Sequence, residues 1–237
     1  MWHEIAVMRN YPTVTTQILY PKYLLKAYLL LFLTLYSSIC IYSQQQPTTT
    51  AWVIPGITYQ HAERLKLSAQ YALSTHQHTH LLYLQSYIGI SKYVILNPAY
   101  LYINYHPPAG PVIPEHSFMT GCLLTTKLNR IILEDRNVIW NRFRQHAADM
   151  HIYRNRLRLT WPLPGKLQQT RIYSFDETWI LINEKRWMRN RIAAGVSSDV
   201  LPWFNLDMSY AYEQDKVNGG LNIFFIMGTI QLSRKQR

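Results

Sequence analysis

The sequence predicts an all-β protein: an antiparallel, up-and-down transmembrane β-barrel of about ten strands, preceded by a signal peptide. Three observations favour this fold class. Segments of roughly ten residues alternate between polar and apolar positions along most of the chain. One uncharged apolar segment lies near the N-terminus, and no later stretch is typical of a spanning helix. Aromatic residues make up 14% of the chain and include 18 tyrosines, as expected where rings occupy membrane–water interfaces.

The amino-acid composition indicates which kinds of molecule the protein can bind. Of the 237 residues, 48% are hydrophobic and 16% are charged, which excludes low-complexity disorder. The 24 Lys and Arg against 13 Asp and Glu give a net charge of +11, which suits nucleic acid or an anionic membrane surface. The arginines alternate within predicted strands and form no exposed stripe, so we expect no nucleic-acid partner. Cys40 and Cys122 are too few for a disulfide scaffold or a four-cysteine zinc site.

Residues 1–43 are predicted to be a signal peptide. The uncharged segment AYLLLFLTLYSSICIY spans 27–42, after Lys22 and Lys26 and before a polar stretch. A basic start, an apolar centre and a small residue before the cut are typical of export, with cleavage expected after Ser43. The alternative is an uncleaved anchor, but the apolar run is shorter than the roughly 20 residues that a spanning helix needs.

The segment 44–62 is predicted to be either a periplasmic N-terminal segment or an extra strand. Trp52 and Tyr59 indicate structure, whereas Pro55 and Gly56 are awkward within a strand. An extra strand with a partner would raise the barrel from about ten to about twelve strands.

The β-barrel itself is predicted over 63–233, followed by a basic tail at 234–237. The alternation is clear in YRNRLRLTW, where Arg154, Arg156 and Arg158 share one face. The expected strands are 64–73, 79–91, 93–105, 117–127, 130–143, 153–161, 170–182, 187–198, 203–212 and 221–233. Closure is expected because lipid offers no hydrogen-bond partner to an exposed strand edge.

The connections between the predicted strands alternate in length along the second half of the chain. Short turns are expected at 91–92, 127–129, 162–166 and 199–202, and longer connections at 106–116, 144–149 and 213–220. Tight periplasmic turns and longer outer loops are typical of outer-membrane barrels. With the C-terminus in the periplasm, this parity starts the strand at 64–73 there too, on the side expected for a cleaved N-terminus.

The polar face of these strands is basic and contains acidic residues that can form ion pairs with the arginines. An arginine fork can hold carboxylates or bridge strands while it stays charged. The network that we expect in the lumen comprises Glu134, Arg136, Arg142, Arg154, Arg156, Arg158, Arg171, Glu177, Arg189, Arg191 and Asp207. It would act as an ionic plug that holds the barrel shape or as a narrow lumen that selects anions. Side chains fill barrels of about this size, so wide conductance is not expected.

Two other groups of residues are candidates for a metal site and for a catalytic site. His76, His78 and His80 would share a side in an extended segment, but no carboxylate or cysteine lies near as a fourth ligand, so we expect no metal and no cofactor. His116 and Ser117 resemble parts of a nucleophilic site, but consecutive residues do not share a strand face. We therefore expect no enzyme.

Several short motifs occur in a characteristic order. They are LEDR at 133–136, RNRLR at 154–158, ETWILIN at 177–183, RNRIAAG at 189–195, YAY at 210–212 and Asn222 at the start of the last strand. With this order the chain resembles the bacterial family called domain of unknown function 2490, over about residues 50–233. The resemblance implies an outer-membrane β-barrel, with no established activity and no catalytic residues. The last strand departs from usual barrel proteins, because it ends Gln231-Leu232-Ser233 without a terminal aromatic residue.

The sequence thus predicts a non-enzymatic protein of the outer membrane of a Gram-negative bacterium, with a structural role or a narrow, plugged pore. The expected partners are outer-membrane lipid and the barrel-insertion machinery, with a small anionic solute as a candidate. One alternative is an outer-membrane barrel enzyme that acts on envelope lipids through His116 and Ser117. The other is a soluble periplasmic β-sandwich that binds an anionic ligand.

Overall fold

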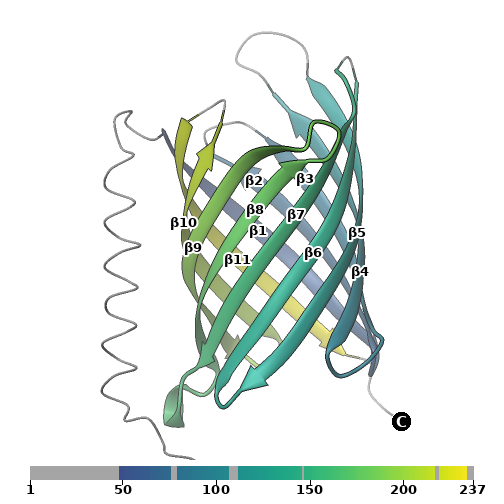
Figure 1. Cartoon of the computed structure of the whole chain (residues 1–237). Helices are drawn as coiled ribbons and strands as arrows, with labels where there is room; N and C mark the ends of the chain where they lie inside the picture. Colours follow the sequence, from purple (N-terminus) through teal and green to yellow (C-terminus); the bar gives the residue numbers. More distant parts are fainter. Residues whose placement is uncertain (1–47, 76–78, 107–111, 146, 217–218, 234–237) are drawn as a thin grey trace, which may run out of the picture. The chain divides into compact units, whose positions relative to one another are not determined.

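The computed structural model describes residues 48–75, 79–106, 112–145, 147–216 and 219–233. In these residues eleven strands form one closed barrel, so the predicted all-β barrel is confirmed (Figure 1). The strands are β1 Thr48–Ala62, β2 Leu65–Ser74, β3 His80–Gly89, β4 Val94–Tyr105, β5 Ile113–Leu128, β6 Ile131–Arg144, β7 Met150–Pro162, β8 Thr170–Leu181, β9 Arg186–Leu201, β10 Phe204–Asp215 and β11 Gly219–Ser233. A single 3-10 turn, η1 (Gly165–Leu167), lies between β7 and β8. Within the described ranges no helix is long and apolar enough to cross a membrane.

The strand count corrects the prediction of ten strands, and also the alternative of twelve. Each strand pairs antiparallel with its sequence neighbours, but β1 and β11 close the barrel as a parallel pair. This parallel seam follows from the odd number, because strands that alternate in direction bring the first and the last into the same direction. Thr48 therefore lies beside Leu221, at the opposite end of the barrel from Ser233. The strand predicted at 64–73, here β2, does start at the end of the barrel where β11 ends, but β1 precedes it and starts at the opposite end.

Strand β1 corresponds to the extra strand that was one of the two alternatives for 44–62, and it contains Pro55 and Gly56, the pair that argued against a strand. The ladder to β2 passes over Pro55, which has no N–H to donate, whereas Pro55 keeps its register with Gly228 of β11. At Gly56 a Cβ atom would lie 2.9 Å from Gln70 Cγ, so glycine allows the close approach of β2. Both residues are therefore accommodated inside a long strand.

The connections are shorter than predicted where strands extend toward them. Strand β5 already begins at Ile113, so the predicted connection 106–116 shrinks to 106–112. Strand β10 continues to Asp215 and β11 begins at Gly219, so 213–220 shrinks to 216–218. The extensions carry Glu115, Glu213 and Asp215, all of which are buried polar side chains. The predicted contrast between short and long connections is weaker as a result.

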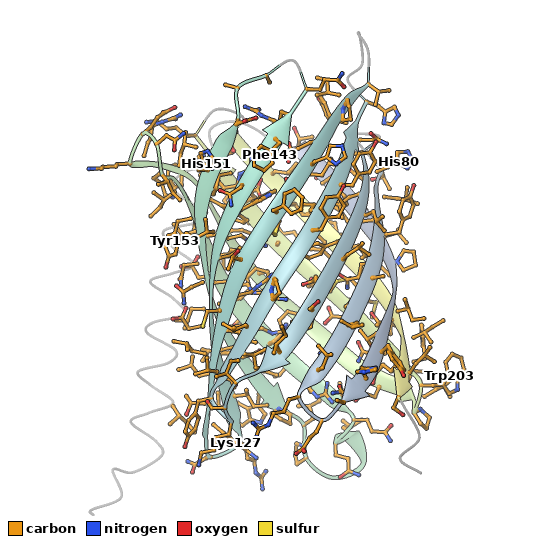
Figure 2. All side chains as sticks on the ribbon, turned by 90° about the vertical axis from the view of Figure 1, so that its right-hand side faces the viewer. His80, Lys127, Phe143, His151, Tyr153 and Trp203 are labelled. Carbon is orange, nitrogen blue, oxygen red and sulfur yellow. The ribbon has the colours of Figure 1, made fainter. Side chains whose placement is uncertain are left out.

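Polarity in the barrel is the reverse of that in a water-soluble protein. Along β7, Leu157 is 47% exposed and Leu159 is 45% exposed, whereas Arg156 and Arg158 are partly buried. All the remaining strands of the barrel likewise expose large apolar side chains. Figure 2 shows outward side chains around the barrel, with His151 toward one end and Trp203 toward the other. The side chains that are removed from the surface include many charged and amide groups.

Apolar packing inside the barrel is limited to three small clusters. They are Leu101 with Met119 and Val138, Ile152 with Trp179 and Leu181, and Ala193 with Ala211 and Ile223. The remaining interior space is lined by polar side chains, and their partners define the candidate site.

Candidate functional site: the interior ionic network

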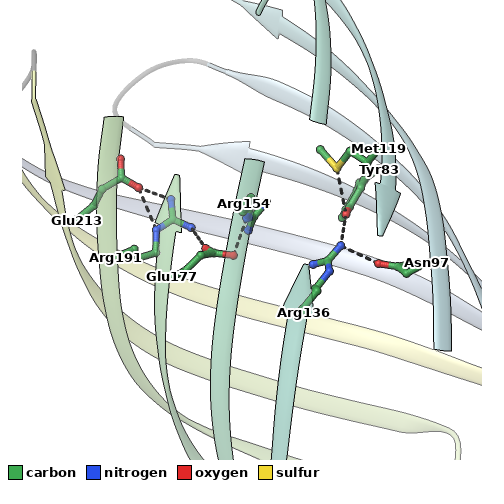
Figure 3. Close-up of polar contacts among 8 residues, drawn as sticks. All are labelled: Tyr83, Asn97, Met119, Arg136, Arg154, Glu177, Arg191 and Glu213. Carbon is green, nitrogen blue, oxygen red and sulfur yellow. Dashed lines mark hydrogen bonds and ion pairs between the residues drawn. The ribbon is translucent and has the colours of Figure 1, made fainter. Parts of the chain in front are cut away.

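The centre of the network is Glu177 on β8, which is only 1% exposed. Its carboxylate accepts a hydrogen bond from Arg154 Nε of β7 at 2.5 Å and lies 3.7 Å from Arg191 Nη1 of β9 (Figure 3). Arg191 donates in turn to Glu213 of β10 at 2.5 Å. One chain of opposite charges thus crosses four neighbouring strands.

This chain continues toward the β10–β11 connection. Arg189 donates to Glu213 at 2.8 Å and pairs with Asp215 at 3.0 Å. The indole ring of Trp179 lies against the cluster, with the guanidinium groups of Arg154 and Arg191 each 5.0 Å from the ring centroid. Trp179 is 3% exposed and so is an interior residue, not a residue of an outer aromatic girdle. Cation–π contacts of this kind hold the forks in place without neutralising them.

A second ion pair joins β5 and β6 at the same end of the barrel. Arg142 makes a two-point contact with Glu115, from Nε at 2.8 Å and from Nη2 at 2.6 Å. Ser117 donates to the same carboxylate at 2.9 Å. A planar fork matched to a carboxylate in this way is the strong geometry for an arginine pair.

A third ion pair lies at the opposite end. Arg171 of β8 donates to Asp199 of β9 at 2.7 Å, and Asn205 of β10 donates to the same carboxylate at 2.9 Å. This pair is more exposed than those of Glu177 and Glu115. It is therefore expected to contribute less to stability.

Arg136 on β6 differs from these arginines because its hydrogen-bond partners are neutral. Its Nη2 donates to Tyr83 of β3 at 2.9 Å and to Asn97 of β4 at 2.8 Å (Figure 3). Neither strand neighbours β6, so the contacts run through the barrel interior. Arg136 is only 9% exposed, and its Nε has no hydrogen-bond partner among the described residues.

The other two predicted acids make weaker or different contacts. Asp207 was expected to answer an arginine, but it accepts a hydrogen bond from the hydroxyl of Tyr173 at 2.5 Å. Glu134 lies 3.8 Å from Arg158, at the long end of the ion-pair range. Arg158 itself lies 3.9 Å above the Tyr173 ring, and Arg156 lies 5.4 Å from the Phe175 ring.

Sequence reasoning missed four acids that complete the network: Glu115, Asp199, Glu213 and Asp215. All four stood in predicted connections or turns. The available signal was the two-residue alternation, which continues from Asp207 through Ser209 and Ala211 to Glu213 and so keeps one face.

The histidine and serine constellations are not assembled into sites. His116 is exposed, and its ring accepts or donates a 2.7 Å hydrogen bond with Tyr100, whereas Ser117 is fully buried on the other face. His80 contacts Tyr71 at 2.6 Å, and His76 and His78 lie outside the described residues. Within the described ranges, no group of three or more His, Cys, Asp or Glu residues could hold a metal ion.

The fold and the interior contacts define a closed β-barrel with an ion-paired interior. The family model described as protein of unknown function (DUF2490) matches residues 65–223, and the chain belongs to this family. The match begins with β2, so the strand that closes the parallel seam lies before it. No curated protein matches the chain.

Proposed function

We propose that the protein is a β-barrel of the outer membrane whose interior is closed by an ionic plug, with a structural role or a narrow pathway for small solutes. The observation that carries the proposal is the reversed polarity of the barrel. Exposed Leu, Ile and Phe side chains would meet water unfavourably but suit lipid, at about 25 cal/mol for each Å² of apolar surface. Buried ion pairs inside a barrel suit a lumen filled by side chains.

Strand length and closure also support a membrane location. The strands run from 10 to 16 residues, and a tilted strand of about 9–11 residues crosses the hydrocarbon layer. The closed sheet leaves no unpaired edge for lipid to meet. The proposed partners are outer-membrane lipid and the barrel-insertion machinery.

Polar groups on the outer face of β6 to β9 pair with one another, which lowers their cost in contact with lipid. Asn155 donates to Asp135 at 2.7 Å, and Asn190 donates to Asp176 at 2.6 Å. Such pairing satisfies the amide donors, but the carboxylates of Asp135 and Asp176 keep their charge, which is costly in an apolar medium. The exposed apolar side chains, and not this band, support the proposed location.

The ionic network favours a plug over an open pore. Glu177, Glu213 and Glu115 each pair with an arginine on a neighbouring strand, and Arg136 reaches through the interior from β6 to Tyr83 and Asn97. An anion would have to displace these partners in order to pass. In a planar bilayer, we expect little or no conductance from the wild type and a larger, anion-selective conductance when Glu177 and Glu213 are both replaced by Gln.

The two alternatives to this proposal are a soluble β-sandwich and an enzyme that acts on envelope lipids. The predicted β-sandwich is wrong, because the sheet closes on itself. For the envelope-lipid enzyme, the opposite faces of His116 and Ser117 favour a protein without this catalytic pair. Lipid release by a Ser117→Ala variant tests it: a loss of release with retained folding would favour the enzyme.

Membrane fractionation tests the proposed location. The full chain, expressed in a Gram-negative host, is expected to sediment with the outer membrane, to resist extraction by alkaline carbonate and to dissolve in detergent. A folded barrel should also migrate differently in gels before and after boiling. Release of folded protein by carbonate without detergent would contradict the proposal.

A further inference from the structure

A cavity of about 440 Å³ lies at the end of the barrel that carries the β1–β2 and β3–β4 turns. Its wall contains Arg64 and Gly89 near those turns and reaches inward to Asn97 and Arg136. This volume is within the range of small-molecule sites, which is about 300–1,000 Å³. The cavity is therefore large enough for a small solute and lies beyond the ion-paired cluster around Glu177.

The lining is strongly basic. Five basic side chains face two acidic ones: the wall includes Arg64, Lys66, Arg136, Arg156 and Arg158 against Glu63 and Glu134. In contrast, the arginines around Glu177 and Glu213 pair with carboxylates at 3.0 Å or less. Positive charge is thus neutralised at one end of the barrel and left in excess at the other.

The basic groups of the cavity have little acidic compensation within the described residues. Only Arg158 has an acidic partner within 4.0 Å, and its distance to Glu134 is 3.8 Å. The buried Nε atoms of Arg136, Arg156 and Arg158 have no hydrogen-bond partner in the described part of the chain. Burial without a partner disfavours a charged donor, so an added acceptor would be strongly stabilised here.

Aromatic rings hold these cations in position. Arg158 lies over Tyr173 and Arg156 over Phe175, while Lys66 lies 4.5 Å from the centre of the Tyr87 ring. Contact with a ring fixes a guanidinium without using its N–H donors. The donors are therefore already placed before any ligand arrives, which reduces the entropy lost on binding.

We infer that this cavity, lined by Lys66, Arg136, Arg156 and Arg158, is a binding site for a small solute that carries several phosphate or carboxylate oxygens. Arginine forks favour such oxyanions because two N–H groups can meet two oxygens. The inference extends the proposed function from a plugged barrel to a solute-binding one. It rests on the closed interior and does not depend on the compartment.

Calorimetric titration of the full chain in zwitterionic detergent micelles, with sodium pyrophosphate as the probe, tests this site. The wild type should bind, and Arg156→Gln should weaken binding at least about tenfold, because a hydrogen bond to a charged group contributes about 1.5–3 kcal/mol. Glu134→Gln should bind a few times more tightly because it removes a repelling charge. Arg186→Gln is the matched control, since Arg186 pairs with Glu184 outside the cavity and should leave binding unchanged.

The gain expected from Glu134→Gln separates a binding role from simple damage to the fold, which would weaken binding. A gel shift on boiling checks that each variant forms a barrel, and Lys66→Gln replaces Arg156→Gln if the latter does not fold. The inference is overturned if millimolar pyrophosphate gives no binding, if Arg156→Gln binds like the wild type, or if the Arg186→Gln control loses as much affinity. A barrel that fractionates with the outer membrane but binds no pyrophosphate would leave the proposed function standing.

Discussion

Replacement of Glu177 by glutamine should destabilise the barrel far more than replacement of an exposed acid. Glu177→Gln keeps the size and shape of the side chain but removes the charge that faces Arg154 at 2.5 Å and Arg191 at 3.7 Å. The residue is 1% exposed, so Arg154 loses its counter-charge away from water and Arg191 keeps only Glu213. Breaking a buried pair by removing one partner costs about 3–5 kcal/mol. We therefore expect a loss of about 3 kcal/mol or more in the free energy of unfolding.

Glu184→Gln is the matched control for this experiment. Glu184 pairs with Arg186 at 2.7 Å, but its side chain is 54% exposed, and surface pairs contribute about 0–1 kcal/mol. Urea unfolding in micelles, followed by tryptophan fluorescence, measures both variants, because Trp179 lies directly against the cluster. Equal stability of the two variants would refute the reasoning that the interior network is dry and paired.

Two further predictions concern the seam and the interior packing. In a background without other cysteines, the pair Ile57→Cys and Ile230→Cys should form a disulfide on oxidation, because these residues are partners in the parallel β1–β11 pair. The control pair Ile57→Cys and Phe224→Cys is out of register and should not form one. The reverse result in a non-reducing gel would argue against the seam. Gly195→Ala should lower the free energy of unfolding by about 1–3 kcal/mol, because its Cβ would lie 2.6 Å from Ser209 and Tyr173 atoms. Gly228→Ala, with its nearest contact at 3.3 Å, is the milder control in the same denaturation assay. Equal losses of stability in the two variants would contradict the packing.

Local alternation was enough to predict most strands and the face on which each arginine lies. In β7 polar and apolar residues alternate from Arg156 to Trp161, so the positions of Arg154, Arg156 and Arg158 on one face follow from the period of two. The same reasoning placed Glu177 and Arg191 on interior positions of β8 and β9. A side chain's face depends only on its own strand, which is why a single sequence predicts it.

Closure of the barrel and choice of partners depend on distant parts of the chain. The pairing of β1 with β11 joins residues as far apart as Thr48 and Leu221, and no local pattern in either strand predicts it. The rule against Pro55-Gly56 in a strand failed because only one of the two ladders is interrupted there. Asp207 pairs with Tyr173, because a face contains several candidate donors and strand register decides which of them is within reach.

The central claim is that the outer face of the barrel meets lipid while its charged face looks inward, and spin labels along β7 test it most directly. In a background with Cys122→Ser, single cysteines at positions 157 to 160 would be labelled in barrels reconstituted into lipid vesicles, and collisions with membrane-dissolved oxygen would be measured. The account predicts high oxygen accessibility at Leu157→Cys and Leu159→Cys, and low accessibility at Arg158→Cys and Thr160→Cys, which lies at a buried position. Uniform accessibility along the strand, or the opposite alternation, would contradict it.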